Sequence, residues 1–445
     1  MKRKIISKLE NWKKSKNRKP LIINGARQVG KTYSVLEFAK QNYENFIYIN
    51  FEFNEIACKI FEKTLDPKEI IETMSIAFKT NILPEKTLIF LDEIQNCEKA
   101  LTSLKYFYEN AKEYHIIAAG SLLGVAINRK NYSFPVGKVE TITLNPMDLV
   151  LLFLLFLLNP MDFEEFLWAN EQEELAKKIR ECFEKDERMN IALHELALNL
   201  YDKYLVIGGM PEVVYKYINE HNIIFAQQTQ GEIINNYISD MAKYATNTES
   251  VKIRAAYNSI PMQLAKENKK FQYKIVQTGG TATIFGASID WLLQSGVILK
   301  CNKLIDAQMP ISAYQDLSSF KIYMSDVGLL TLKSNMSYEF LLDKDDSNNN
   351  FMGALVENYV AQALNNNGYD LFYWTNKGTA EVDFIIQKGK DIIPVEVKAG
   401  KNVTAKSLNI YIESKKPKYS VRISRRNFGF ENNIKSVPLY AVFCI

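Results

Sequence analysis

Histidine and cysteine are scarce in this chain, which limits the metal sites that it can build. The three histidines among 445 residues are far apart, so a histidine-rich zinc or iron site is not expected. The five cysteines are scattered, odd in number and without Cys-x-x-Cys spacing. This pattern argues against a zinc site and favours reduced thiols.

Long apolar runs are also lacking. The most membrane-like stretch, residues 149–158, is too short to cross a bilayer, which takes about 20 residues. The basic N-terminus is not followed by the apolar segment of a signal peptide. We therefore expect a cytoplasmic protein with no membrane partner.

Composition and charge are ordinary for a globular protein. Hydrophobic residues make up 47% of the chain and charged residues 24%, and the length suits about two to four domains. The net charge of +4 neither requires nor excludes a nucleic-acid partner. Residues 1–20 are basic and have helical apolar spacing, which fits either a helix packed on the first domain or a nucleic-acid contact.

A phosphate-binding loop follows the apolar run at residues 21–23. The motif consists of Gly25, Ala26, Arg27, Gln28, Val29, Gly30, Lys31 and Thr32. Gly25 and Gly30 let backbone N–H groups approach phosphates closely. Lys31 is expected to reach the β and γ phosphates of ATP, and the Thr32 hydroxyl to bind Mg²⁺. The sequence therefore predicts a nucleotide site.

A second strand carries the expected acidic partners of this loop. The apolar run 88–91 ends in Asp92 and Glu93. Asp92 is expected to hold Mg²⁺ through water, and Glu93 to polarise the attacking water, although two carboxylates can also mark a solvated strand end. Ser121, after the apolar run 115–120, fits either a polar sensor of the γ-phosphate or the cap of the next helix.

The order of the elements predicts an α/β multidomain protein. Strands that alternate with helices indicate a parallel sheet with the ligand at the carboxyl ends of its strands. The expected strands are residues 21–23, 45–52, 88–93, 115–121 and 139–144. A helical segment at 161–245 fits a lid on this core. Three short helices and a β element at 246–342 fit a winged-helix-like domain, which serves either DNA binding or packing.

The last segment, 343–445, has a second group of charged residues. Asp383 and Glu396 lie on consecutive strands, and a hairpin would place them side by side with Lys398 on the face of Glu396. Two carboxylates suit a hard divalent ion, and a nearby lysine can lower the pKa of a water. A salt-bridged hairpin explains the same spacing.

Together these motifs resemble one family, the archaeal and bacterial AAA-type P-loop ATPases whose C-terminal domain resembles restriction endonucleases. The resemblance runs through residues 25–32, 91–95, 120–121, 158–163, 208–211, 322–328, 355–358, 381–384 and 395–398. It implies an ATPase core at 1–160, a helical lid at 161–245, a winged-helix-like domain at 246–342 and a restriction-endonuclease-like domain at 343–445. It also places Glu357, Asp383, Glu396 and Lys398 at nuclease metal-site positions. The departure is an apolar insert between two copies of Leu-Asn-Pro-Met-Asp, at 144–148 and 158–162.

The sequence therefore predicts an ATP-hydrolysing protein with ATP and Mg²⁺ as ligands, acting as a conformational switch with DNA, a protein partner or further copies of itself. Lys31 and Glu93 are the expected catalytic residues, with Ser121 as a sensor. Arg27, Arg129 and Arg254 are candidates for a charge-stabilising arginine. The alternatives are an ATP-gated, metal-dependent DNA nuclease and a non-catalytic C-terminal platform for DNA or protein.

Overall fold

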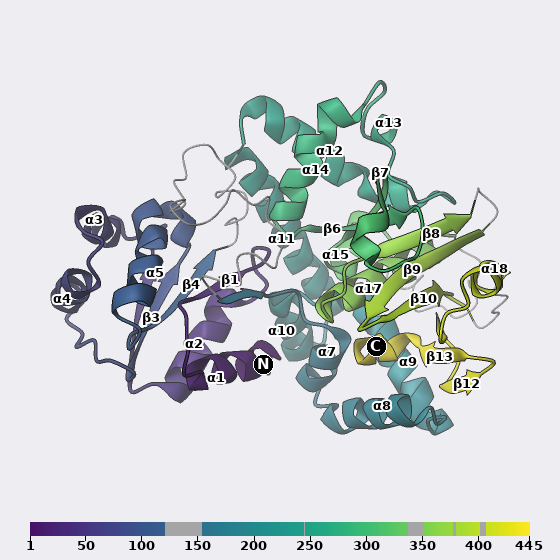
Figure 1. The fold of residues 1–445 in the computed structure, drawn as a ribbon, viewed down its shortest axis with the longest axis horizontal. Helices are drawn as coiled ribbons and strands as arrows, with labels where there is room; N and C mark the ends of the chain where they lie inside the picture. The colour runs from purple at the N-terminus through teal and green to yellow at the C-terminus, as the bar shows by residue number, and fades with distance from the viewer. Residues whose placement is uncertain (121–153, 244, 337–349, 377–379, 401–405) are drawn as a thin grey trace. The chain divides into compact units, whose positions relative to one another are not determined.

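The chain folds into two compact units, which are described separately. One comprises residues 2–159, and the other comprises residues 160–445 together with Met1 (Figure 1). The computed structural model describes residues 1–120, 154–243, 245–336, 350–376, 380–400 and 406–445.

The first unit contains a five-stranded parallel sheet in the order β2-β3-β4-β1-β5. Its strands are β1 (Leu21–Asn24), β2 (Asn45–Asn50), β3 (Thr87–Asp92), β4 (His115–Gly120) and β5 (Leu154–Leu157). Its helices are α1 (Ile5–Lys14), α2 (Lys31–Asn42), α3 (Glu55–Lys63), α4 (Pro67–Ala77), η1 (Ile94–Asn96) and α5 (Glu98–Asn110). The predicted α/β core with a parallel sheet is confirmed.

The central strands of this sheet are buried along their whole length, as expected of a parallel sheet that is covered on both faces. All six residues of β3 are buried, as are all six of β4. The apolar run of the insert provides β5, which pairs with β1 through Leu154 opposite Leu21. The strand expected at 139–144 lies outside the described residues.

The second Leu-Asn-Pro-Met-Asp copy is held by hydrogen bonds on both sides. The Leu158 N–H donates to the Asn24 carbonyl oxygen at 2.8 Å, and the Arg3 guanidinium donates to the Asn159 carbonyl oxygen at 2.9 Å. Asp162 then caps α7 (Phe163–Ala169) in a capping box with Glu165. The first copy lies outside the described residues.

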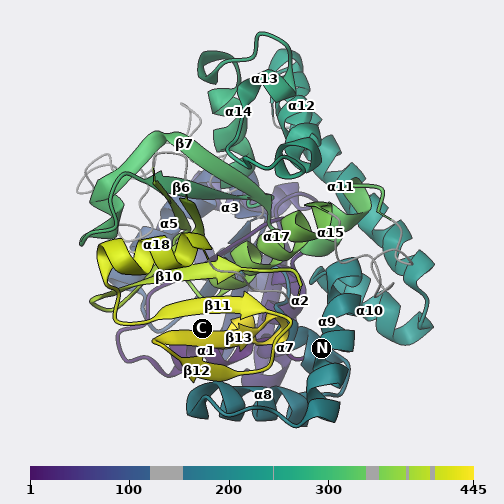
Figure 2. The same ribbon diagram turned by 90° about the vertical axis from the view of Figure 1, so that its right-hand side faces the viewer.

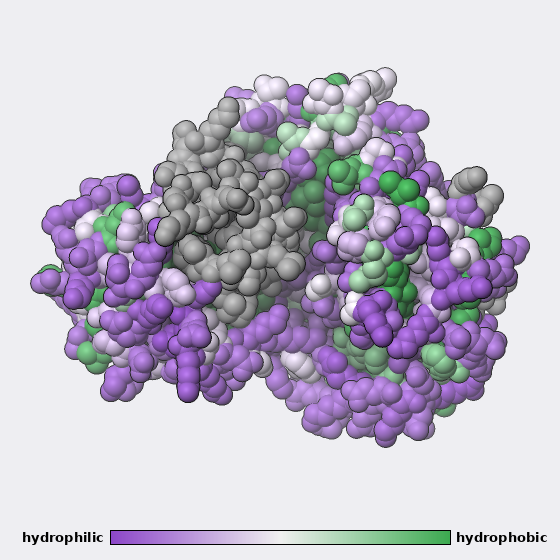
Figure 3. All heavy atoms as spheres, viewed as in Figure 1, coloured by the Kyte–Doolittle hydropathy of each residue, from purple (hydrophilic) through white to green (hydrophobic). Residues whose placement is uncertain are grey.

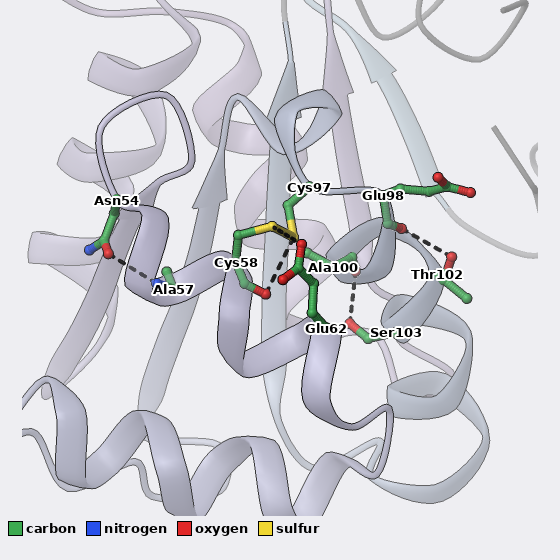
Figure 4. The surroundings of a disulfide bond; sticks show 9 residues. All are labelled: Asn54, Ala57, Cys58, Glu62, Cys97, Glu98, Ala100, Thr102 and Ser103. Atoms are coloured by element: carbon green, nitrogen blue, oxygen red, sulfur yellow. Dashed lines mark hydrogen bonds between the residues drawn. A yellow bond between two sulfur atoms is a disulfide. The ribbon is translucent and has the colours of Figure 1, made fainter. Parts of the chain in front are cut away.

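A disulfide joins Cys58 on α3 to Cys97, the residue before α5 (Figure 4). The Cα atoms are 5.7 Å apart although 39 positions separate them in the sequence. This corrects the expectation of five reduced thiols, which took no account of α3 packing against α5. In the described part of the chain Cys182, Cys301 and Cys444 take part in no disulfide.

Helices dominate the first half of the second unit. They are α7, α8 (Glu173–Lys185), α9 (Ile191–Ile207), α10 (Pro211–Glu220), α11 (Ile223–Lys243), α12 (Asn247–Leu264), α13 (Tyr273–Val276), α14 (Ala282–Gln294) and α15 (Val327–Lys333). Asp202 on α9 forms a two-point ion pair with Arg425, at 2.7 and 2.6 Å. His194, also on α9, is hydrogen-bonded to Tyr440. The helices of the expected lid therefore pack in one unit with the C-terminal segment.

One eight-stranded sheet organises the rest of this unit, in the order β12-β13-β11-β10-β9-β8-β6-β7 (Figure 2). The strands are β6 (Ile298–Leu304), β7 (Gln315–Met324), β8 (Phe372–Asn376), β9 (Ala380–Lys388), β10 (Asp391–Val397), β11 (Ser420–Ser424), β12 (Gly429–Glu431) and β13 (Ile434–Pro438). The remaining helices are η3 (Ile311–Tyr314), α17 (Asn350–Asn366), α18 (Lys406–Lys415) and η4 (Leu439–Cys444). Strands β6 and β7 precede the expected boundary at residue 343, so a single sheet spans it.

The apolar run at residues 437–443 predicts a last strand, and this prediction is wrong for most of the run. Strand β13 ends at Pro438, and Leu439–Cys444 forms the 3₁₀ helix η4. Leu439 to Phe443 are all buried, and a short continuous apolar run does not distinguish a buried strand from a buried helix.

Within the described ranges, no helix is long and apolar enough to cross a membrane. The surface seen in Figure 3 is mostly hydrophilic, with its hydrophobic side chains in small groups.

Candidate functional site

The phosphate-loop motif connects β1 to α2 at the carboxyl edge of the first sheet. Gly25 has φ 151°, and a Cβ at this position would lie 2.2 Å from the Leu158 carbonyl oxygen. Gly30, with φ 88°, is the N-cap of α2 and supplies no side-chain cap. The first N–H groups of α2 therefore meet no capping side chain, which is the arrangement that binds anions at helix N-termini.

The Lys31 side chain turns back toward the phosphate loop that precedes it. Its ammonium group donates to the carbonyl oxygens of Gly25, at 2.9 Å, and Ala26, at 2.7 Å. Burial lowers the pKa of Lys31 to about 8, against the opposing effect of the carboxylates of Glu93 and Asp92. A buried ammonium group that donates to carbonyl oxygens is well placed to exchange these partners for phosphate oxygens, with which it forms stronger, charge-assisted hydrogen bonds.

Thr32 and Asp92 bring the loop and the acidic strand together. The Thr32 hydroxyl donates to Oδ2 of Asp92 at 2.7 Å, and the Tyr48 hydroxyl donates to the same oxygen at 3.2 Å. Burial raises the pKa of Asp92, partly offset by the Thr32 hydrogen bond. A hydroxyl oxygen beside a carboxylate at the edge of a parallel sheet is a donor set that fits Mg²⁺.

Glu93 follows β3 in the left-handed region, with φ 48°. The side-chain amide of Gln95 donates to Oε2 of Glu93. The backbone N–H of Glu93 donates to Oδ1 of Asp92 at 3.0 Å, which holds the two acidic residues in one turn.

The other residues that the sequence predicts for this site are the candidate arginines and one serine. Arg27 lies within the loop and is partly exposed, and Arg254 is exposed on α12. Ser121 and Arg129 lie outside the described residues. The sequence reasoning missed Arg3, which is buried and donates to the Val29 carbonyl oxygen of the loop at 2.9 Å. No local signal marks Arg3, because this contact bridges 26 positions of sequence.

The second group of predicted residues gathers around the β9–β10 hairpin. Val395 pairs with Phe384, and the same register places Glu396 opposite Asp383. The Val397 N–H donates to Oδ2 of Asp383 at 2.8 Å. Lys398 forms an ion pair of 2.7 Å with Oε1 of Glu396, so the hairpin contains the salt bridge that the sequence left as an alternative.

Two lysines that the sequence reasoning missed occupy this cluster. Lys321 on β7 lies 2.9 Å from Oε1 of Glu357 and 2.6 Å from Oε1 of Glu381. Lys269 forms an ion pair with Oε2 of Glu357. The signal for Lys321 was a lysine within the apolar strand Phe-Lys-Ile-Tyr-Met, since a charge in a buried strand requires a partner.

The electrostatics of the cluster follow from these contacts. Burial raises the pKa of Glu357, but the ammonium groups of Lys269 and Lys321 more than offset this effect and hold it low. Burial, with the nearby carboxylates of Glu357 and Glu396, raises the pKa of Asp383. Among the residues that the structure describes, no three acidic, histidine or cysteine side chains are grouped to hold a metal ion. In this arrangement lysine side chains pair with the carboxylates of Glu357 and Glu396.

Family comparisons divide the chain into three segments. Residues 17–151 match the family described as AAA domain. Residues 198–339 match a domain of unknown function (DUF8612), and residues 352–442 match a domain of unknown function (DUF4143). No curated protein matches the sequence.

Solved structures resemble the chain at low sequence identity. A Walker-type ATPase of Pyrococcus abyssi is 15% identical, with a TM-score of 0.43, over 75% of this chain and 95% of its own. The Orc1 protein of Aeropyrum pernix, in complex with DNA, is 11% identical, with a TM-score of 0.28, over 75% and 91%. DnaA of Aquifex aeolicus, bound to AMPPCP, is 15% identical, with a TM-score of 0.23, over 65% and 86%.

The match at 17–151, with the parallel sheet and the loop at its edge, defines this part of the chain as an AAA-type P-loop ATPase domain. The two later segments match families whose function is not defined.

Proposed function

We propose that the first unit binds and hydrolyses ATP with Mg²⁺, and that hydrolysis switches the conformation of the protein around a DNA or protein partner. The observation that carries this proposal is the meeting of Lys31, Thr32 and Asp92 at one sheet edge, with the Thr32–Asp92 hydrogen bond at 2.7 Å. Phosphoryl transfer depends mainly on positioned positive charge and a bound Mg²⁺, and these residue types supply both requirements.

Each residue has a stated role in the proposal. Backbone N–H groups of residues 25–32 surround the phosphates, and Lys31 stabilises the transferring phosphoryl group. Thr32 and Asp92 would hold Mg²⁺, which neutralises phosphate charge. Glu93 orients the attacking water and accepts its proton. Ser121 remains a proposed sensor, and the charge-stabilising arginine remains open among Arg27, Arg129 and Arg254.

Lys31→Ala tests the nucleotide site. We expect this variant to lose ATP turnover at least about 10²-fold, because a charge-stabilising donor to the transition state is removed. Lys40→Ala is the matched control, since Lys40 lies on the same helix in an exposed pair with Glu37. Equal turnover by Lys31→Ala and Lys40→Ala would remove the site assignment.

DNA as the partner is supported by exposed basic residues in the segment expected to be winged-helix-like. Arg254 on α12, Lys266 and Lys274 are exposed. The test measures ATP turnover with and without double-stranded DNA at low and moderate salt. Stimulation that falls with salt would indicate contacts to the DNA backbone. Turnover that is indifferent to DNA would favour a protein partner, with the C-terminal segment as a docking platform.

A further inference from the structure

Lys321 is the most deeply buried charge in the C-terminal cluster. Its side chain has 0% exposure, and its ammonium group lies between Oε1 of Glu357 on α17 and Oε1 of Glu381 on β9. The aromatic ring of Tyr373 on β8 lies 5.0 Å from the same ammonium group. An unpaired lysine would not remain charged at this depth, so these contacts hold a cation inside the sheet.

Both carboxylate oxygens of Glu357 already accept hydrogen bonds, three in all. Its Oε1 accepts hydrogen bonds from the Lys321 ammonium group, at 2.9 Å, and from the Tyr323 hydroxyl. Its Oε2 accepts from the Lys269 ammonium group. These donors fill three of the roughly four acceptor positions of a carboxylate, and two of them are ammonium groups that a metal ion would have to lie beside.

We propose that Lys321 is the resident cation of this carboxylate cluster, and that the C-terminal sheet therefore binds no divalent metal ion and serves as a non-cleaving scaffold. A divalent ion beside Glu357 would lie within a few ångströms of the Lys321 ammonium group, where the repulsion in a buried site is large. Moving Lys321 away would leave its own charge buried without a partner. The lysine and the metal ion thus exclude each other.

The cluster contains three ammonium groups and four carboxyl groups. Lys269, Lys321 and Lys398 pair with Glu357, Glu381 and Glu396, and Asp383 is the fourth carboxyl group. The buried Oε2 of Glu396 accepts no hydrogen bond from the described residues. This oxygen, opposite Asp383, is the place where a metal ion would enter if Lys321 were neutralised.

The first experiment titrates nucleotide-free full-length protein with MnCl₂ and follows free Mn²⁺ by electron paramagnetic resonance. We expect wild type and Asp383→Asn to give the same titration, and Mn²⁺ or EDTA to shift the melting temperature of both proteins equally. Saturable Mn²⁺ binding by wild type that is lost in Asp383→Asn would overturn the proposal. Asp92→Asn is the control that assigns any ion bound in the ATPase domain.

The second experiment removes the resident charge. Lys321→Met keeps the length of the side chain but leaves Glu357 and Glu381 without their shared partner. We expect this variant to gain saturable Mn²⁺ binding, and the added Asp383→Asn change to abolish it. Unchanged Mn²⁺ binding by folded Lys321→Met would contradict the role of Lys321. If this variant does not fold, the titrations of wild type and Asp383→Asn still decide the proposal.

A cleavage assay completes the test. Wild type is incubated with single- and double-stranded DNA, with Mg²⁺ or Mn²⁺ and with or without ATP. We expect no cleavage above that of Asp383→Asn. Metal-dependent cleavage that disappears in Asp383→Asn would show that a divalent ion does enter the cluster.

Discussion

The Thr32 hydroxyl donates a hydrogen bond of 2.7 Å to Oδ2 of Asp92, joining the first turn of α2 to the end of β3. The two residues are 60 positions apart in the sequence and come from different motifs. Their contact sets the distance between the phosphate loop and the acidic strand.

Thr32→Val should therefore impair Mg²⁺-dependent turnover while keeping the shape of the side chain. We expect kcat to fall about 10²-fold, because the hydroxyl proposed to contact the metal is lost. Thr32→Ser retains the hydroxyl and is the control, with turnover near that of wild type. The measurement is steady-state ATP hydrolysis at saturating Mg²⁺. Similar rates for the valine and serine variants would show that the hydroxyl plays no part in turnover.

Nucleotide affinity should depend on pH through Lys31. Burial lowers the pKa of Lys31 to about 8, so the charged form that attracts phosphates is present below this pH and is lost above it. We expect the Kd for a fluorescent ATP analogue to rise about tenfold for each pH unit above 8. Lys31→Arg stays charged and should lack this step. A pH profile that is the same in both proteins would assign the effect to another group.

Gly209 should not tolerate a side chain. A Cβ at Gly209 would lie 1.9 Å from the Met161 carbonyl oxygen and 2.9 Å from the Tyr204 hydroxyl. We expect Gly209→Ala to lower the free energy of unfolding by about 3 kcal/mol, because two packed segments must move apart. Gly231→Ala is the matched control: nothing lies within 4 Å of its added Cβ on α11. It should raise stability by about 1 kcal/mol. Urea denaturation of both variants measures the free energy of unfolding, which should fall in Gly209→Ala and rise in Gly231→Ala.

Reduction should destabilise the first unit through the Cys58–Cys97 disulfide. The bond closes a loop with a sequence separation of 39, and chain entropy predicts a loss of about 4 kcal/mol on opening it. Cys58→Ser should match reduced wild type and should no longer respond to dithiothreitol. Cys182→Ser, at a cysteine outside the disulfide, should respond as wild type does. The measurement is the thermal unfolding temperature with and without reductant. An equal drop in this temperature for Cys58→Ser and wild type would contradict a stabilising role of the disulfide.

Local sequence patterns were sufficient where neighbouring residues determine the geometry. The phosphate loop, the acidic strand and the β9–β10 hairpin each depend on spacing within one short segment, and the structure forms all three. Each also has a distinctive composition, such as paired glycines or an apolar run that ends in carboxylates. The parallel sheet of the first unit followed from the alternation of strands and helices.

Contacts between distant segments were not predictable in the same way. The pairing of β6 with β8 and the ion pair of Lys321 with Glu357 depend on how whole elements pack. The disulfide depends on two helices that meet on one face of the sheet. A single sequence carries no direct record of such pairings. Which charged residues are buried, and which residues they pair with, is therefore seen only in the folded chain.

The shared eight-stranded sheet sets a limit on how this protein can be cut, expressed in pieces or recombined. A fragment that starts at residue 343 would lack β6 and β7 and would leave β8 as an unpaired edge. Such an edge recruits strands from other molecules, so this fragment should aggregate. A fragment that starts before β6 keeps the edge covered. The segment that must stay together for this sheet to form is therefore longer than the family match at 352–442. A fusion or an exchange of segments between relatives would have to include residues 298–438 as one piece.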